Sequence, residues 1–171
     1  MSALVWIATA CVACAVMEPW AALLHGRVWH KVLWRVHRSH HAMRPRRFEA
    51  NDALSALHAP IAILLILYGC RGDAGIWRDV AFGAGIGMSL FGVSYAVVHD
   101  GLVHGRLPVA ALGRLRYFAR VRDAHLAHHR GHGGPYGLFL GPWEETQPSD
   151  EDRHARLNPR SRHTRRARPT A

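Results

Sequence analysis

Residues 80–98 read VAFGAGIGMSLFGVSYAVV, nineteen consecutive positions without a charged side chain. As an α-helix that rises about 1.5 Å per residue, this stretch is about 28 Å long, close to the thickness of the hydrocarbon core of a bilayer. It is therefore the strongest candidate in the chain for a membrane-spanning helix.

Two further apolar stretches predict two more spans. Residues 53–70 hold no formal charge, and Pro60 falls in the first turns of the stretch, where proline is best tolerated. Residues 2–24 are uncharged apart from Glu18, which either lies buried inside the span or, with Pro19, marks a kink. A cleaved signal peptide is the competing interpretation of this stretch, although no basic residue precedes its apolar run.

The charge distribution predicts the orientation of the spans. The chain holds 22 Lys and Arg against 12 Asp and Glu, for a net charge of +10, and the basic residues gather in residues 25–50 and after residue 98. By the positive-inside rule these segments are cytoplasmic. The sequence thus predicts an all-α integral membrane protein with about three transmembrane helices and a cytoplasmic, histidine-rich helical cap. Residues 107–121 are amphipathic and are expected to lie on the membrane surface.

The predicted membrane domain covers residues 1–145, and residues 146–171 are predicted to be a basic, disordered tail. This tail lacks apolar periodicity and aromatic residues, so lipid headgroups suit it better than nucleic acid. The three cysteines, Cys11, Cys14 and Cys70, all lie in apolar stretches, which argues against a disulfide-stapled secreted fold.

Histidine is the most informative residue type in the chain, with fourteen copies against a single lysine. Imidazole is the commonest protein ligand for transition metals. Ten of the fourteen fall in four groups, namely His25 and His30; His37, His40 and His41; His99 and His104; and His125, His128 and His129. A single surface histidine carries no such signal, but ten without neighbouring cysteines exceed the need of one ion. The sequence therefore predicts two metal ions.

The spacing within the groups predicts how the rings are presented. On a helix, each H-x-x-H-H motif places three imidazoles on one face. His30, His37 and His41 also share a face if one helix continues from the membrane. The five-residue pairs lie far apart around an ideal helix, so they need either a helix break or two metals approached from different sides, and the second arrangement is favoured.

Two other kinds of metal centre fit the sequence less well. A haem held by paired histidines would need them inside the spans, where only His58 lies. Soluble di-iron bundles use two Glu-x-x-His motifs that project from helices, and a second such motif is absent from the sequence.

The same residues resemble the membrane fatty-acid hydroxylase superfamily, and within it the bacterial β-carotene hydroxylases. The resemblance covers roughly residues 17–141 and rests on Met17-Glu18 leading to His25, His37-Arg38-Ser39-His40-His41, Phe48-Glu49-x-Asn51-Asp52, His99-Asp100-Gly101-Leu102-Val103-His104, and Ala124-His125 to His128-His129. It loosens at Pro135-Tyr136-Gly137-Leu138-Phe139, and the arginine-rich tail has no counterpart.

The resemblance implies a monooxygenase with two iron ions (Fe2+) held by the ten histidines, with no other catalytic side chain. It implies O2 as cosubstrate and electrons from NAD(P)H through ferredoxin or a reductase. The implied substrate is membrane-dissolved β-carotene, hydroxylated at C3 and C3′ of its β-ionone rings to give zeaxanthin through β-cryptoxanthin. The implied location is the bacterial inner membrane, with the histidines facing the cytoplasm.

Two alternatives to this function stay open. A related oxygenase, such as a carotenoid ketolase or a sterol or fatty-acid hydroxylase, would use the same metal-binding face with another substrate. A non-enzymatic metal store or transporter would instead need polar residues along the spans, and these are scarce.

Residues beside the histidines are candidates for orienting them. Metal-bound histidines usually donate their second N–H to a carboxylate or carbonyl, which points to Asp100 beside His99 and to Asp123 beside His125. The alternative for Asp123 is a surface ion pair with a neighbouring arginine.

Two further polar features are assigned structural roles. Asn51-Asp52 is expected to cap the second span, since both residue types are good N-caps. His58 is an intramembrane polar residue, and its expected environment is the interior of the bundle.

Overall fold

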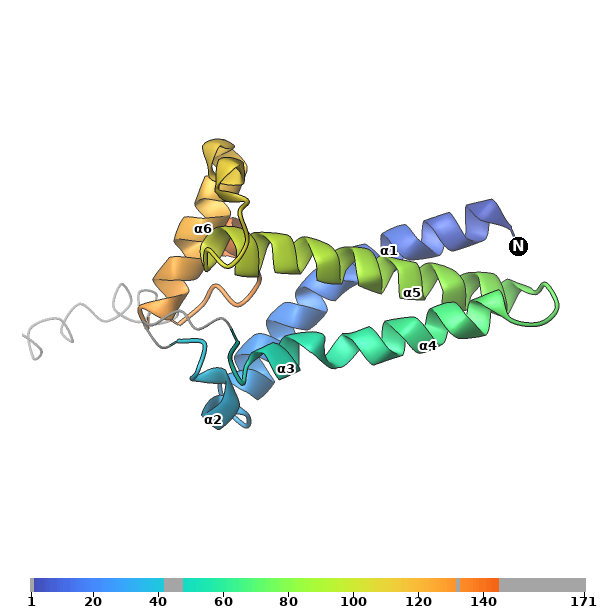
Figure 1. Ribbon diagram of the computed structural model, residues 1–171, viewed down its shortest axis with the longest axis horizontal. Helices are drawn as coiled ribbons and strands as arrows, with labels where there is room; N and C mark the ends of the chain where they lie inside the picture. The colour runs from blue at the N-terminus through green and yellow to red at the C-terminus, as the bar shows by residue number, and fades with distance from the viewer. Residues whose placement is uncertain (1, 42–47, 132, 145–171) are drawn as a thin grey trace, which may run out of the picture.

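The structure, a computed structural model, describes residues 2–41, 48–131 and 133–144, and every element in these ranges is helical (Figure 1). The predicted disordered tail, residues 146–171, lies outside the described residues. The longer helices are α1 (Ala3–Leu24), α4 (Ala59–Cys70), α5 (Ile76–Tyr95) and α6 (Arg116–His129). The short ones are α2 (Trp34–His37), α3 (Asp52–Ser55) and α7 (Gly141–Glu144), with π-helices η1 (His25–Trp29) and η3 (Ala96–Val103) and 3-10 helices η2 (Ala56–His58) and η4 (Ala110–Arg114).

Three continuous helical segments are long and apolar enough to cross a membrane, namely Ala3–Trp29, Asp52–Cys70 and Ile76–Val103. They contain the three stretches predicted from the sequence except for Ser2, and the all-α integral membrane fold is confirmed. The first segment passes through Pro19 without ending, because α1 continues to Leu24.

The outer surface of these helices is apolar. Leu4, Val12, Ile63, Leu64 and Trp77 each expose more than half of their surface. Lipid tails are a matching solvent for such side chains, whereas the helices satisfy their own backbone groups, so the surface fits a bilayer.

Small residues on α5 allow its close packing against α1. A Cβ atom added to Gly83 would lie 2.3 Å from the carbonyl oxygen of Trp6, and one added to Gly87 would lie 2.3 Å from that of Ala10. Membrane helices gain little from burying apolar surface against each other, so close backbone contact at small residues is a main source of their association. α5 also packs against α4, and is therefore the central helix of the three (Figure 1).

The remaining elements gather at the end of the bundle away from the N-terminus (Figure 1). Their core consists of Val98, Val103, Val121 and Leu138. Residues 107–121, expected to form one amphipathic surface segment, are divided between η4 and the start of α6 at Arg116. This end of the molecule holds the histidine groups.

Candidate metal centre

All ten histidines singled out from the sequence lie together in space. Two groups have ligand atoms within 4.8 Å of one another: cluster A is His25, His30, His37, His41 and His128, and cluster B is His40, His99, His104 and His125. His129 lies where the clusters meet, because its Nε2 is 3.0 Å from Nε2 of His125 in cluster B and its ring stacks on His41 in cluster A at 4.4 Å between centroids.

The two π-helices bring together the histidines that are five residues apart, His25 with His30 and His99 with His104. The backbone N–H of His30 donates to the carbonyl of His25 at 3.0 Å, and that of His104 to the carbonyl of His99 at 3.0 Å. Residues five apart point about 140° away from each other on an α-helix, but hydrogen bonds from i to i+5 turn them to one side. The ring centroids are 5.0 Å apart for the first pair and 4.7 Å apart for the second.

The expectation that each pair reaches metals from different sides is therefore wrong. Each pair stays within one cluster, and a local change in helical hydrogen bonding replaces the helix break. Insertions of π-helix are rare and occur mostly at functional sites.

The first H-x-x-H-H motif is only partly helical. α2 ends at His37, so His40 and His41 lie in the turn that follows, and no single helix runs from the membrane through the motif. The motif still serves the centre, because Nε2 of His41 lies 3.2 Å from Nε2 of His37 in cluster A. His40 turns to cluster B, with its Nε2 2.9 Å from Nε2 of His99.

The second H-x-x-H-H motif lies on α6, as predicted. It also divides between the clusters, because His128 belongs to cluster A and His125 to cluster B. Both side chains are buried, while His129 is half-buried.

The Nδ1 atoms of five rings face outward to acceptors of the protein. His25 Nδ1 donates to the Tyr136 carbonyl at 2.8 Å, His37 Nδ1 to Asn51 Oδ1 at 2.7 Å, His40 Nδ1 to Glu49 Oε2 at 3.3 Å, His99 Nδ1 to Asp100 Oδ1 at 2.9 Å, and His128 Nδ1 to the Gly133 carbonyl. A neutral imidazole that donates through Nδ1 leaves a lone pair on Nε2. These contacts therefore present the Nε2 lone pairs inward, as in a metal site.

The inward Nε2 atoms oppose one another at close range. The distance is 3.1 Å between His25 and His37 and 2.9 Å between His40 and His99, and the Nδ1 atoms of all four rings donate outward. Protonation of His37 does not relieve the repulsion between the two lone pairs at neutral pH, because burial lowers the pKa of His37 to about 4. The hydrogen bond to Asn51 raises this pKa, but by less than burial lowers it. Burial likewise lowers the pKa of His104, in cluster B, to about 3. Lone pairs held this close favour a cation between them, and an all-imidazole donor set suits iron, zinc, copper or nickel.

An arginine organises the carboxylates beside cluster B. The Arg106 guanidinium lies 2.9 Å from Glu49 Oε2, 2.8 Å from Asp52 Oδ1 and 3.6 Å from Asp100 Oδ1. Glu49 and Asp100 are the two carboxylates that accept from His40 and His99. Arg106 thus compensates the charges that orient two histidines, including Glu49, which is only 5% exposed.

Two predictions about orienting residues have opposite outcomes. Asp100 contacts His99 as expected. Asp123 does not have the expected role: it accepts from Arg122 at 3.1 and 3.0 Å, with its side chain 65% exposed. Because α6 buries Ala124 and His125, the neighbouring Asp123 turns to the surface, and the alternative of a surface ion pair is confirmed.

Three residues that orient the histidines, Glu49, Asn51 and Arg106, were not predicted from the sequence. The cap expected at Asn51 is wrong, because its side chain makes no cap hydrogen bond and instead accepts from His37. The signal was present in the motif Glu49-x-Asn51-Asp52, which contributes polar residues beside a histidine-rich segment. Arg106 had no local signal, since its two closest partners, Glu49 and Asp52, are distant in sequence.

Glu18 and His58, two polar residues of the spans that the sequence singled out, have defined surroundings. Glu18 is buried, and its Oε1 accepts from the backbone N–H of Leu140 at 2.9 Å. The first span therefore holds a buried acid, one of the two arrangements expected. His58 accepts at Nε2 from Trp20 Nε1 at 3.0 Å and lies apart from both clusters.

The fold and the two clusters define an all-helical membrane protein with a histidine-rich site suited to metal binding. Residues 10–147 match the model of the fatty acid hydroxylase family, and the chain belongs to this family.

Individual relatives carry more specific names. The chain is 47% identical over 130 residues to the chloroplastic beta-carotene 3-hydroxylase of Gentiana lutea, covering 75% of this chain and 40% of that protein. It is 39% identical over 143 residues to the beta-carotene hydroxylase of Pantoea ananas, covering 81% of this chain and 79% of that protein. The chain thus spans about two fifths of the length of the plant relative. No solved structure matches the chain.

Proposed function

We propose that the protein is an O2-dependent, non-haem di-iron monooxygenase that hydroxylates β-carotene at C3 and C3′, giving zeaxanthin through β-cryptoxanthin. The observation that carries the proposal is the meeting of nine imidazoles in two adjacent clusters, with His129 at their boundary and Nε2 atoms turned inward. The substrate follows from the names of relatives in plants and in a bacterium.

Cluster A and cluster B would each hold one iron ion, with His129 at their boundary. Bound iron would supply the activation of dioxygen, using electrons from NAD(P)H through ferredoxin or a reductase. The protein's own part is to hold each Nε2 lone pair in place through the Nδ1 hydrogen bonds, with Asp100 among the acceptors. Burial of His37, His125 and His128 keeps bulk water from the centre.

The proposed setting is the cytoplasmic side of a bacterial inner membrane, with the hydroxylase domain in residues 1–145. Its support is that His25 and His99 lie at the ends of spans that lead into arginine-rich segments. A substrate dissolved in the bilayer and an electron donor dissolved in the cytosol can both reach a site at this boundary.

A second candidate is a related oxygenase that acts on another lipid, such as a carotenoid ketolase or a sterol or fatty-acid hydroxylase. The description of the matching family model favours it. The two candidates share the metal centre and differ in product.

Expression in a bacterial host that accumulates β-carotene tests the proposal. Chromatography should show zeaxanthin with the wild type, and purified protein should contain two iron ions. His37→Ala and His128→Ala should abolish conversion, whereas Asp123→Asn, on the surface, should not. Unchanged pigment from a folded, iron-loaded protein would reject the substrate, and full conversion by either histidine variant would reject the ligand roles.

A further inference from the structure

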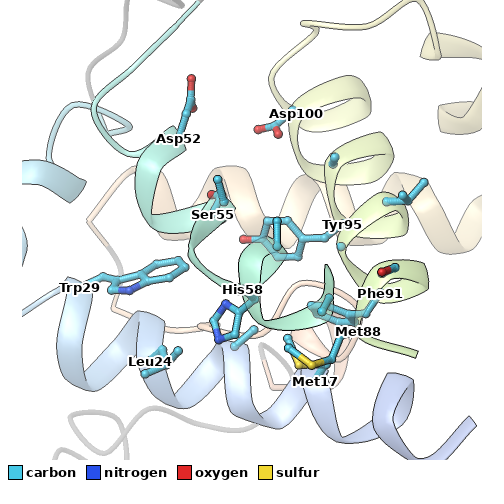
Figure 2. Close-up of a pocket in the computed structure, with 18 residues that line it drawn as sticks. Met17, Leu24, Trp29, Asp52, Ser55, His58, Met88, Phe91, Tyr95 and Asp100 are labelled. Carbon is cyan, nitrogen blue, oxygen red and sulfur yellow. The ribbon is translucent and has the colours of Figure 1, made fainter. Parts of the chain in front are cut away.

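An apolar cavity of about 440 Å³ lies among α1, α4 and α5. Figure 2 shows Asp52 and Asp100 at one end of it and Met17 and Met88 at the other. Its volume falls within the usual range of ligand pockets, and most of its lining is apolar. It is separate from the clusters, since neither their nine histidines nor His129 are among its lining residues in the described part of the chain.

Two aromatic side chains in the wall of the cavity also contact the clusters. Trp29 lines the cavity and lies 5.7 Å from His25 of cluster A, between ring centroids. Tyr95 lines the cavity and packs on His99 of cluster B at 4.7 Å between centroids, with 30° between the ring planes. A molecule in the cavity therefore lies against residues that contact both clusters.

The cavity opens sideways, towards the face that lipid would cover. Its lining residues Ser55, Ala59 and Val93 are exposed at the surface of the helical bundle. The hydrogen bond from Trp20 Nε1 to His58 Nε2, at 3.0 Å, links α1 to η2, whose His58 also lines the cavity. A hydrocarbon can thus reach the cavity from the bilayer without crossing water.

We propose that this cavity receives one cyclic end of the polyene, and that Trp29 and Tyr95 set the depth of the ring and so decide which ring carbon faces the metal centre. The inference rests on the proposed function. At about 30 Å³ for each water-sized group, the cavity holds about fifteen non-hydrogen atoms, enough for one end group and a few chain carbons. The rest of the polyene stays in lipid.

The shape of the cavity wall determines the position of the ring more than the apolar character of the wall does. A polyene in the bilayer is already in hydrocarbon, so moving it into the cavity gains little hydrophobic free energy. What distinguishes one ring position from another is van der Waals contact with fixed surfaces. Rigid aromatic rings anchored on His25 and His99 provide such surfaces.

Gly92→Leu tests the cavity without touching the clusters. Gly92 lines the cavity, and a Cβ atom added to it meets nothing within 4 Å, so the leucine occupies cavity space without disturbing packing. Gly75→Leu is the matched control, because Gly75 also has open space and is not among the lining residues. We expect Gly92→Leu to lower conversion of β-carotene at least tenfold at unchanged iron content, and Gly75→Leu to retain wild-type conversion. Wild-type conversion by Gly92→Leu would overturn the proposal.

Tyr95→Leu and Tyr95→Phe test the depth of the ring. Tyr95→Phe keeps the wall and should yield 3-hydroxylated product, whereas Tyr95→Leu shortens it and should add product hydroxylated at a second ring carbon. Loss of rate by Tyr95→Leu without a new regioisomer would overturn the assigned role.

Direct binding separates this inference from the proposed function. Circular dichroism of β-carotene added to purified protein in detergent should show an induced band with the wild type and with Gly75→Leu, and a weaker one with Gly92→Leu. If the wild-type protein binds β-carotene in this way but does not hydroxylate it, the proposed function is wrong and the assignment of the cavity is still supported. The Gly92→Leu variant could instead lose a phospholipid that co-purifies with the wild type while it binds β-carotene normally. That result would overturn the assignment, because the cavity would then hold an acyl chain.

Discussion

The chemistry of the centre depends on the partners of individual rings. His37 is buried, and its Nδ1 donates to Asn51 Oδ1 at 2.7 Å. That hydrogen bond sets the tautomer and leaves Nε2 as a ligand atom. The sequence identified the ring but not its acceptor, because Asn51 is also a common cap residue and only the fold shows which role it has.

Replacing Asn51 by leucine should weaken metal binding. The variant removes the acceptor of His37 Nδ1, so the ring loses its fixed orientation, and we expect about 10- to 100-fold lower metal affinity. Competition with a chelator measures the affinity. Asn51→Asp keeps an acceptor oxygen and should bind metal more tightly than Asn51→Leu, and equal affinity of the two variants would contradict the assigned role.

Replacing Arg106 by leucine should destabilise the fold. Arg106 is 14% exposed and Glu49 5% exposed, so the variant leaves a buried carboxylate without its cation, at a cost of about 3–5 kcal/mol. Thermal unfolding in detergent measures the loss. Arg122→Leu is the matched control, because its partner Asp123 is exposed and the pair contributes about 1 kcal/mol or less. Similar melting temperatures for the two variants would show that the network does not stabilise the protein.

At the scale of the elements, the spans followed from charge-free runs, but the π-helices did not. A long run without charges needs hydrocarbon or a protein core around it wherever it folds. A membrane span can therefore be predicted from the run itself, without knowledge of the rest of the fold. The switch to i→i+5 hydrogen bonds at His25 and His99 depends on packing against the other histidine segments, which no local pattern encodes. The brevity of α2, which ends at His37, has the same origin.

Gly83→Leu should separate α1 from α5. An added Cβ would lie 2.3 Å from the Trp6 carbonyl oxygen, a backbone atom that cannot move without shifting the helix. We expect a loss of about 1–3 kcal/mol or more, seen as a lower melting temperature and less folded protein in size-exclusion chromatography. Gly75→Leu should leave both unchanged. A wild-type melting temperature for Gly83→Leu would show that the helices do not need this close contact.

At the scale of the whole molecule, the metal centre connects the histidine segments at the end of the bundle, which the packing of the membrane spans alone does not hold together. Cluster A contains residues from η1, α2 and α6, and cluster B contains residues from the turn after α2, from η3 and from α6. A ligand that binds only the folded state stabilises it by mass action, so bound metal should hold these elements together. The ten ligand candidates were predictable because imidazole is rare and grouped in this sequence. Their division between two clusters was not, because each H-x-x-H-H motif contributes to both.

The metal-free protein should lose stability as the pH falls below about 6.5, the ordinary histidine pKa. Burial lowers the pKa of His30 to about 4 and, together with neighbouring histidines, that of His41 to about 3. Between these values and 6.5, the unfolded chain binds protons that the folded chain does not, so the free energy of unfolding decreases as protons are added. Melting temperatures measured from pH 8 to pH 5 should be level above pH 7 and then decline.

The melting temperature of the iron-loaded protein should begin to decline at a lower pH, because the metal competes with protons for the same Nε2 atoms. A metal-free protein that melts at the same temperature at pH 5 and pH 8 would show that these rings are not buried as neutral imidazoles.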